Sequence, residues 1–159
     1  MSDDSLYHEK QELALCGVHA LNNLMQGPAF GAGDLASIAL KLDDAERALL
    51  TDDMAAAQLA AETDPGRSHR IDMKTGDFSF EVLAAALETC GVGLINCDHA
   101  SVAEAAATKP EAEEAFLVHR SSHWFALRRV ASLWWNVDSK ASAQDRSPQF
   151  SPPSLLLLS

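Results

Sequence analysis

The chain has 159 residues, of which 47% are hydrophobic and 22% are charged, and this is typical of one globular domain with a hydrophobic core. Its formal net charge of -11 disfavours nucleic acid and anionic membrane as partners and favours a protein with a basic face. No run approaches the roughly 18 apolar residues of a membrane span, so we expect no transmembrane segment.

The first half of the chain is predicted to be mainly helical. Residues 16–25 form a first helix that ends before Gly27 and Pro28, because neither residue continues a helix. Asp34 is predicted to be the N-cap of a second helix with one apolar stripe. The Ala-rich residues 52–62 are predicted to form a further helix antiparallel to it.

The second half changes from helices to strands. The predicted elements are, in order, a loop at 64–70, a helix at 80–90 closed by Gly91, a strand at 92–97, and a helix at 101–115 broken at Pro110. Aromatic and β-branched residues then predict three successive antiparallel strands, at 115–120, 123–130 and 133–139. Residues 141–159 are rich in proline and serine and are interpreted as a tail.

The three cysteines are an odd number in a chain whose residues 1–10 lack the apolar core of a secretion signal, which favours reduced thiols. We therefore expect a monomeric cytoplasmic protein, with a nuclear location as the alternative. Cys90 continues an apolar helix face and Cys97 falls in a predicted strand, so both are interpreted as core residues. A metal site of Cys90, Cys97 and His99 is conceivable, but the spacing matches no standard zinc pattern.

Cys16 opens the first predicted helix. Helical periodicity puts Val18, Leu21 and Met25 on the buried face. Cys16 falls nearly opposite, toward His19. A helix N-terminus offers unpaired N–H groups and about half a positive charge, which stabilise a thiolate. Cys16 is therefore a candidate nucleophile, and a small apolar residue at the helix start is an equally good interpretation.

A cysteine nucleophile needs a base and a group that orients the base. His19 can contact Cys16 from the same helix, but the sequence supplies no partner to orient it. His123 opens a predicted strand that returns through residues 131–132 and is the preferred candidate. The other histidines are interpreted as solvated or structural: His8, His69, His99 and His119.

Hairpin geometry indicates which residue would orient His123. If residues 131–132 form a two-residue loop, Leu127 pairs with Asn136, and the side chains of His123 and Asp138 share one face of the sheet. Asp138 lies diagonal to His123, within reach of a hydrogen bond, whereas Asn136 lies about 13 Å away along the strand. The geometry favours Asp138, although Ala-Ser is not a favoured hairpin dipeptide and a loop of odd length would separate the two residues.

Several segments together resemble the Josephin domain, a papain-like cysteine protease family of deubiquitinating enzymes that includes ataxin-3 and the small Josephin-domain proteins. They follow the family's order over about residues 7 to 140: 7–27, 34–43, 75–88, 123–130 and 134–140. The most specific is the Gln-x4-Cys-x2-His-x2-Asn-Asn block that starts at Gln11. The resemblance implies an α+β papain-like fold, with a helical part that carries an arm and a C-terminal antiparallel sheet.

The resemblance also implies hydrolysis of isopeptide or peptide bonds at the C-terminus of ubiquitin. Cys16 corresponds to the nucleophile, His123 to the general base, and Asp138 to the orienting residue, which is aspartate in the small members. Gln11 matches the glutamine that donates to the oxyanion. Residues 34–63 match the arm that contacts ubiquitin. The implied partners are ubiquitin, polyubiquitin and ubiquitinated proteins, and no cofactor or metal is implied.

One departure from the family keeps a second function open. The family continues past the third strand with a helix and a closing strand, whereas this chain has its Pro- and Ser-rich tail there. We therefore predict a catalytic domain at residues 1–140 and a tail at 141–159. An active deubiquitinase is favoured because all four expected catalytic residue types are present, and a catalytically weak or inactive ubiquitin-binding module is the alternative.

Overall fold

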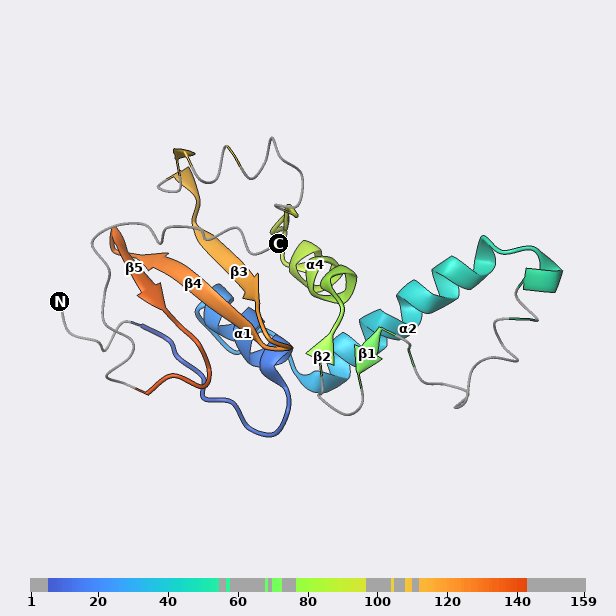
Figure 1. Cartoon of the computed structure of the whole chain (residues 1–159), viewed down its shortest axis with the longest axis horizontal. Helices are drawn as coiled ribbons and strands as arrows, with labels where there is room; N and C mark the ends of the chain where they lie inside the picture. The colour runs from blue at the N-terminus through green and yellow to red at the C-terminus, as the bar shows by residue number, and fades with distance from the viewer. Residues whose placement is uncertain are drawn as a thin grey trace.

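The computed structural model describes residues 6–54, 57, 68, 70–72, 77–96, 104, 108, 109 and 112–142. Helices come first in the chain and the main sheet comes last, which is the α+β organisation expected (Figure 1). The described elements are α1 (Cys16–Met25), α2 (Ala32–Ala48), β1 (Ile71–Asp72), β2 (Asp77–Phe78), α4 (Phe80–Thr89), β3 (Ala115–His119), β4 (Trp124–Val130) and β5 (Leu133–Asn136).

The core lies between α1 and the sheet β3-β4-β5. Helix α1 packs against the central strand β4, and α4 packs against α2, whose C-terminal half projects away from the sheet (Figure 1). Leu21, Leu83 and Val137 are fully buried and join α1, α4 and the end of the sheet in one cluster. Among the described residues, no helix combines the length and the apolar character that a bilayer crossing requires.

Helix α1 has the predicted bounds, but its surroundings differ from the prediction. All its residues except Met25 are buried, and Cys16 is only 3% exposed. The face of α1 opposite the predicted apolar stripe, where Cys16 was placed, is therefore buried as well. The reason is that the opposite face of α1 is covered by the preceding segment, whose Glu9 and Glu12 backbone N–H groups donate to side chains of this helix.

The main sheet is a meander whose register was predicted correctly. β3, β4 and β5 pair in order, and Leu127 lies opposite Asn136. The loops at 121–122 and 131–132 each have two residues with positive φ, between 50° and 68°. This is the type I′ conformation, whose twist matches that of the flanking strands. The second loop forms even though Ala-Ser is not a dipeptide that favours it.

The start of α2 differs from the prediction, whereas the end of α4 agrees with it. α2 begins at Ala32, and Gly31 is its N-cap. Asp34 is therefore not the N-cap as predicted but the third helical residue, and its Oδ2 accepts the Gly31 backbone N–H at 2.8 Å. α4 ends as predicted, with Gly91 at a φ of 74°.

Two further predictions after α4 are wrong. Cys90 is exposed rather than buried, because it is the C-cap of α4 and lies beyond the helix's last buried turn. Residues 92–96 form no strand, and β1 and β2, which pair antiparallel, were not predicted because each has only two residues. Other predictions fall wholly or mostly outside the described residues: the helices at 52–62 and 101–115, the loop at 64–70, Cys97, His69, His99 and the tail.

The β4–β5 hairpin gives a stability prediction. Replacing its loop by Ala131→Asn with Ser132→Gly should raise the free energy of unfolding by about 1 kcal/mol, because asparagine and glycine adopt positive φ at lower cost. Urea unfolding measures the change. Ala45→Gly, at an exposed position inside α2, is the control and should lower the same free energy by about 1 kcal/mol. A less stable Asn-Gly variant would contradict the turn type.

Candidate active site

Cys16 lies at a helix end that favours negative charge. It is the first residue of α1, no described side chain caps this end, and the first turn contains no acidic residue. The backbone N–H groups of the first turn therefore lack helical partners, and together with the helix dipole they stabilise a thiolate. The same N–H groups are available to a developing oxyanion.

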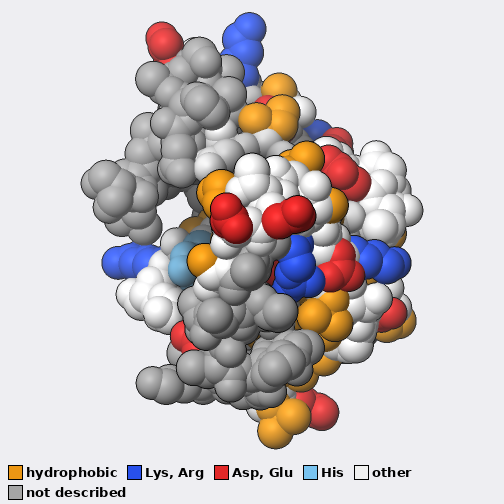
Figure 2. Space-filling model, turned by 90° about the vertical axis from the view of Figure 1, so that its right-hand side faces the viewer, with side chains coloured by type: hydrophobic (Ala, Val, Ile, Leu, Met, Phe, Trp, Pro, Cys, Tyr) orange, Lys and Arg blue, Asp and Glu red, His pale blue; other side chains and the backbone are white. Residues whose placement is uncertain are grey.

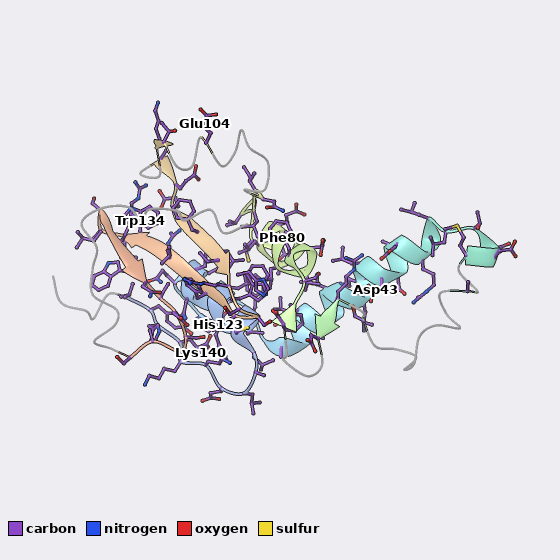
Figure 3. All side chains as sticks on the ribbon, in the orientation of Figure 1. Asp43, Phe80, Glu104, His123, Trp134 and Lys140 are labelled. Carbon is purple, nitrogen blue, oxygen red and sulfur yellow. The ribbon has the colours of Figure 1, made fainter. Side chains whose placement is uncertain are left out.

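His123 and Asp138 form a direct pair, as the strand register predicted. His123 Nε2 lies 2.7 Å from Asp138 Oδ1, and the imidazole is half-buried against Phe125. Figure 3 labels His123 at the lower end of the main sheet. A carboxylate only accepts hydrogen bonds, so Nε2 carries the hydrogen. His123 Nδ1 is buried and has no hydrogen-bond partner among the described residues. The pair therefore presents a basic nitrogen that is free to exchange a proton.

Asp138 is held by backbone contacts on both sides. Its Oδ1 also accepts the Lys140 N–H at 2.9 Å, and its own N–H donates to Asn136 Oδ1 at 3.2 Å. Asn136 thus shapes the loop that carries Asp138, whereas the contact to His123 comes from Asp138 itself. The contact of His123 is thus with Asp138 and not with Asn136, while the orienting role of Asp138 stays a prediction.

Phe78 links the surroundings of Cys16 and His123. Its ring lies against Gly17, because a Cβ atom added to this glycine would lie 3.4 Å from Phe78 Cδ2. Its carbonyl accepts the Trp124 indole N–H at 3.0 Å. Gly17 follows Cys16 and Trp124 follows His123. Strand β2 therefore brings the start of α1 and the start of β4 to one place, and Figure 1 shows the β3–β4 turn pointing toward β2 beside α1.

Asn23 connects α1, the helix of Cys16, to the strand end before Asp138. Its side chain is completely buried. Its Nδ2 donates to the carbonyls of Glu9 at 3.1 Å and Val137 at 3.0 Å, while its Oδ1 accepts the Glu9 N–H. Because Val137 precedes Asp138, this carboxamide fixes α1 relative to the Asp138 carboxylate.

The segment before α1 also holds the Asp138 loop. His8 Nε2 donates to the Asp138 carbonyl at 2.7 Å, and the Gln11 N–H donates to the Ser139 carbonyl at 3.0 Å. The interpretation of His8 as solvated or structural missed this contact. Its position in residues 7–27, the first of the segments that resemble the family, was the available signal.

Gln11 lies between the Asp138 loop and the start of α1. Its Nε2 donates to the Leu13 carbonyl at 2.9 Å, and its Oε1 accepts the Ser139 hydroxyl at 3.4 Å. A carboxamide nitrogen carries two N–H groups, so one remains for a substrate oxygen. The oxyanion role of Gln11 stays a prediction.

His19 is engaged elsewhere. Its Nε2 accepts the Glu12 N–H at 3.1 Å, and its Nδ1 lies 3.1 Å from Glu9 Oε2. Both ring nitrogens thus face the segment that precedes α1, which favours a structural role over the role of base.

The Tyr7 phenol, in the same segment, has a shifted pKa. Burial, followed by the Glu9 carboxylate, raises this pKa above its ordinary value of 10.0.

The described residues contain no group of three His, Cys, Asp or Glu side chains that could hold a metal ion. Cys97 and His99, two members of the conceivable metal site, lie outside those residues. Cys90, the third member, is exposed at the end of α4.

A cysteine that opens a buried helix, packed on an antiparallel sheet that carries a histidine–carboxylate pair, places the protein among the papain-like folds. Sequence comparison identifies the family. The sequence model of the Josephin family matches residues 11–151, so the chain belongs to the Josephin family. The match extends past residue 140, and the boundary between domain and tail stays a prediction.

Its relatives include ataxin-3 homologues. The chain is 40% identical to an ataxin-3 homolog of Arabidopsis thaliana, over 91% of this chain and 51% of that protein. It is 38% identical to a putative ataxin-3 homolog of Oryza sativa subsp. japonica, over 91% of this chain and 44% of that protein. It is 33% identical to ataxin-3 of Homo sapiens, over 86% of this chain and 37% of that protein. The chain thus spans about half the length of these relatives or less.

Two neighbouring asparagines provide a matched prediction about the site. Asn23→Ala should lower the free energy of unfolding by about 3 kcal/mol, because it leaves buried backbone groups of Glu9 and Val137 without partners. It should also slow alkylation of Cys16 by iodoacetamide per folded molecule. Urea unfolding and peptide mass spectrometry measure the two effects.

Asn22→Ala is the control. Asn22 is equally buried but binds Glu9 Oε2 and the backbone of Phe30. It should lower stability by a similar amount and leave the reactivity of Cys16 in the folded protein unchanged. Equal loss of reactivity in both variants would contradict the role given to Asn23.

Proposed function

We propose that this protein is a ubiquitin-specific cysteine protease that hydrolyses isopeptide or peptide bonds at the C-terminus of ubiquitin. The observation that carries the proposal is the 2.7 Å contact between His123 and Asp138, which leaves the buried Nδ1 of His123 without a partner. Membership of the Josephin family supplies the substrate class, because this is a family of cysteine-protease deubiquitinases.

The proposed reaction is acyl transfer through a thioester. His123 Nδ1 takes the proton of Cys16, and the thiolate attacks the carbonyl carbon of ubiquitin's terminal glycine. The tetrahedral intermediate collapses, and the amine leaves with the proton from His123. His123 then takes a proton from water, which attacks the thioester and releases the ubiquitin carboxylate and the thiol.

Two groups stabilise the intermediate in this mechanism. The backbone N–H of Cys16 at the start of α1 and the remaining carboxamide N–H of Gln11 donate to the oxyanion. Loss of one such donor costs about 3 kcal/mol of transition-state stabilisation. Asp138 holds the imidazole so that Nδ1 is the basic nitrogen, and it stabilises the imidazolium that forms.

The helical arm is the proposed contact for ubiquitin, and part of its negative charge is paired within the chain. Asp43 and Glu46 bind Arg70 at 3.0 Å and 2.7 Å, and Asp44 binds Arg47. Figure 2, which looks onto the side where α2 projects, shows acidic and basic side chains interspersed. These three carboxylates of α2 are therefore partly neutralised within the chain.

The rest of the proposal concerns partners and location. Polyubiquitin and ubiquitinated proteins are the proposed substrates, and a monomeric protein in the cytoplasm or nucleus is the proposed state. These statements rest on family membership, on the acidic composition and on the odd number of cysteines.

A ubiquitin probe tests the nucleophile. Ubiquitin with a C-terminal vinyl methyl ester should label the protein at Cys16 and should not label Cys16→Ala. Cys90→Ala removes the exposed cysteine and should label as fast as the wild type. Mass spectrometry identifies the modified residue. If the wild type binds ubiquitin but is not labelled, the protein is a ubiquitin-binding module instead.

Hydrolysis of a fluorogenic C-terminal amide of ubiquitin tests the base and its orienting group. His123→Ala should lower kcat about 10³-fold, because the proton transfers lose their acceptor. Asp138→Ala should lower kcat substantially but less, since the imidazole remains. Asn136→Ala, which removes only the contact to the Asp138 N–H, should have the smallest effect. A larger loss in Asn136→Ala than in Asp138→Ala would assign the orienting role to Asn136.

A further inference from the structure

A second carboxylate–histidine pair lies beside the proposed active site. Asp77 Oδ2, at the start of β2, lies 3.0 Å from Nε2 of His119, at the end of β3. β2 and β3 belong to different sheets, so the pair fastens the small sheet to the main one. The interpretation of His119 as a solvated or structural residue gave it no partner, and the mechanism above does not use it.

This pair belongs to a closed ring of four residues, which are joined by three side-chain contacts and one peptide bond. The His119 ring lies 4.3 Å from the Trp124 ring, and the Trp124 indole N–H donates to the Phe78 carbonyl at 3.0 Å. Phe78 follows Asp77 in β2, so the peptide bond completes the ring. The Trp124 residue is only 7% exposed, while the His119 side chain is 44% exposed. The imidazole therefore lies on the solvent side of the ring, next to the indole.

The ring contacts the chain neighbours of both reacting side chains, Trp124 beside His123 and Gly17 beside Cys16. His119 and Trp124 are paired across β3 and β4, and Arg120 and His123 close the turn between them with backbone hydrogen bonds of 2.9 Å and 3.0 Å. A shift of Trp124 therefore shifts His123. On the other side, Phe78 lies against Gly17, the neighbour of Cys16.

We propose that Asp77 and His119 are positioning residues that fix the β3–β4 turn against β2 and so set the placement of His123 relative to Cys16; this rests on the proposed function. Asp77 Oδ1 is buried and has no hydrogen-bond partner among the described residues, so the contact to His119 is what stabilises this carboxylate. Loss of either partner lets the turn move, and a displacement of about 1 Å can cost about 10²-fold in rate.

Two readouts test the proposal. The first is kcat for the fluorogenic ubiquitin amide, which should fall about tenfold in Asp77→Ala and in His119→Ala with little change in KM, because the pair does not contact ubiquitin. The double variant should be no slower than either single variant, since the two side chains act as one unit.

The second readout is the pH dependence of iodoacetamide alkylation at Cys16, followed by peptide mass spectrometry. It needs no ubiquitin. In both alanine variants the reactive thiolate should appear at higher pH than in the wild type, because a displaced imidazolium stabilises it less. If the wild type does not hydrolyse the ubiquitin amide but this shift is seen, the proposed function fails and the positioning role stands.

Conservative and remote variants separate positioning from general stability. Asp77→Asn keeps an oxygen that accepts the His119 N–H and should restore most of kcat and the wild-type alkylation profile. Glu114→Gln removes the 2.8 Å ion pair with Arg129 from the same sheet and should leave both readouts unchanged. Urea unfolding gives the folded fraction of every variant.

The proposal also predicts the effect of keeping only the ring contact. His119→Phe retains an aromatic ring beside Trp124 but cannot bind Asp77, and it should show the same loss as His119→Ala. If the alanine variants do not fold, His119→Phe is measured in their place. An unchanged alkylation profile in His119→Phe, or losses of kcat that only follow the folded fraction, would overturn the proposal.

Discussion

The site depends on the hydrogen bonds of one buried carboxamide, Asn23. It holds both backbone groups of Glu9 and the carbonyl of Val137, and so joins the helix of Cys16, the segment before it and the strand end that leads to Asp138. Because the side chain is completely buried, water cannot replace these bonds when one is lost. The relative position of the Cys16 thiol and the Asp138 carboxylate therefore follows from packing inside the core, without a contact between the two side chains.

The same principle applies on the other side of the site, where β2 takes the place of Asn23. Phe78 contacts the start of α1 with its ring and the start of β4 with its carbonyl. His123 is thus placed by Trp124 next to it and oriented by Asp138. An imidazole bound at Nε2 and unpaired at Nδ1 is suited to moving a proton, since one nitrogen is fixed and the other is free.

Charge is arranged differently from what the composition indicates. The formal net charge is -11, yet Arg70 gathers carboxylates from α2 and α4, with Asp43, Glu46 and Glu81 at 3.0, 2.7 and 3.7 Å. This group of charges joins the C-terminal half of α2 to the start of α4. The ability of α2 to attract a basic partner is therefore smaller than a count of its acidic residues implies.

The sequence by itself determined the features that depend on near neighbours: the bounds of α1, the order of the three strands, and the hairpin register that brings His123 to Asp138. A period of two and a two-residue loop are local properties, and they suffice to pair residues on adjacent strands. Only the tertiary structure decided that Cys16 is buried, that Cys90 is exposed, and that His8 and His119 have partners at Asp138 and Asp77. Each of these depends on a segment distant in the chain or on the last turn of a helix, and periodicity contains no information about which segment covers which face.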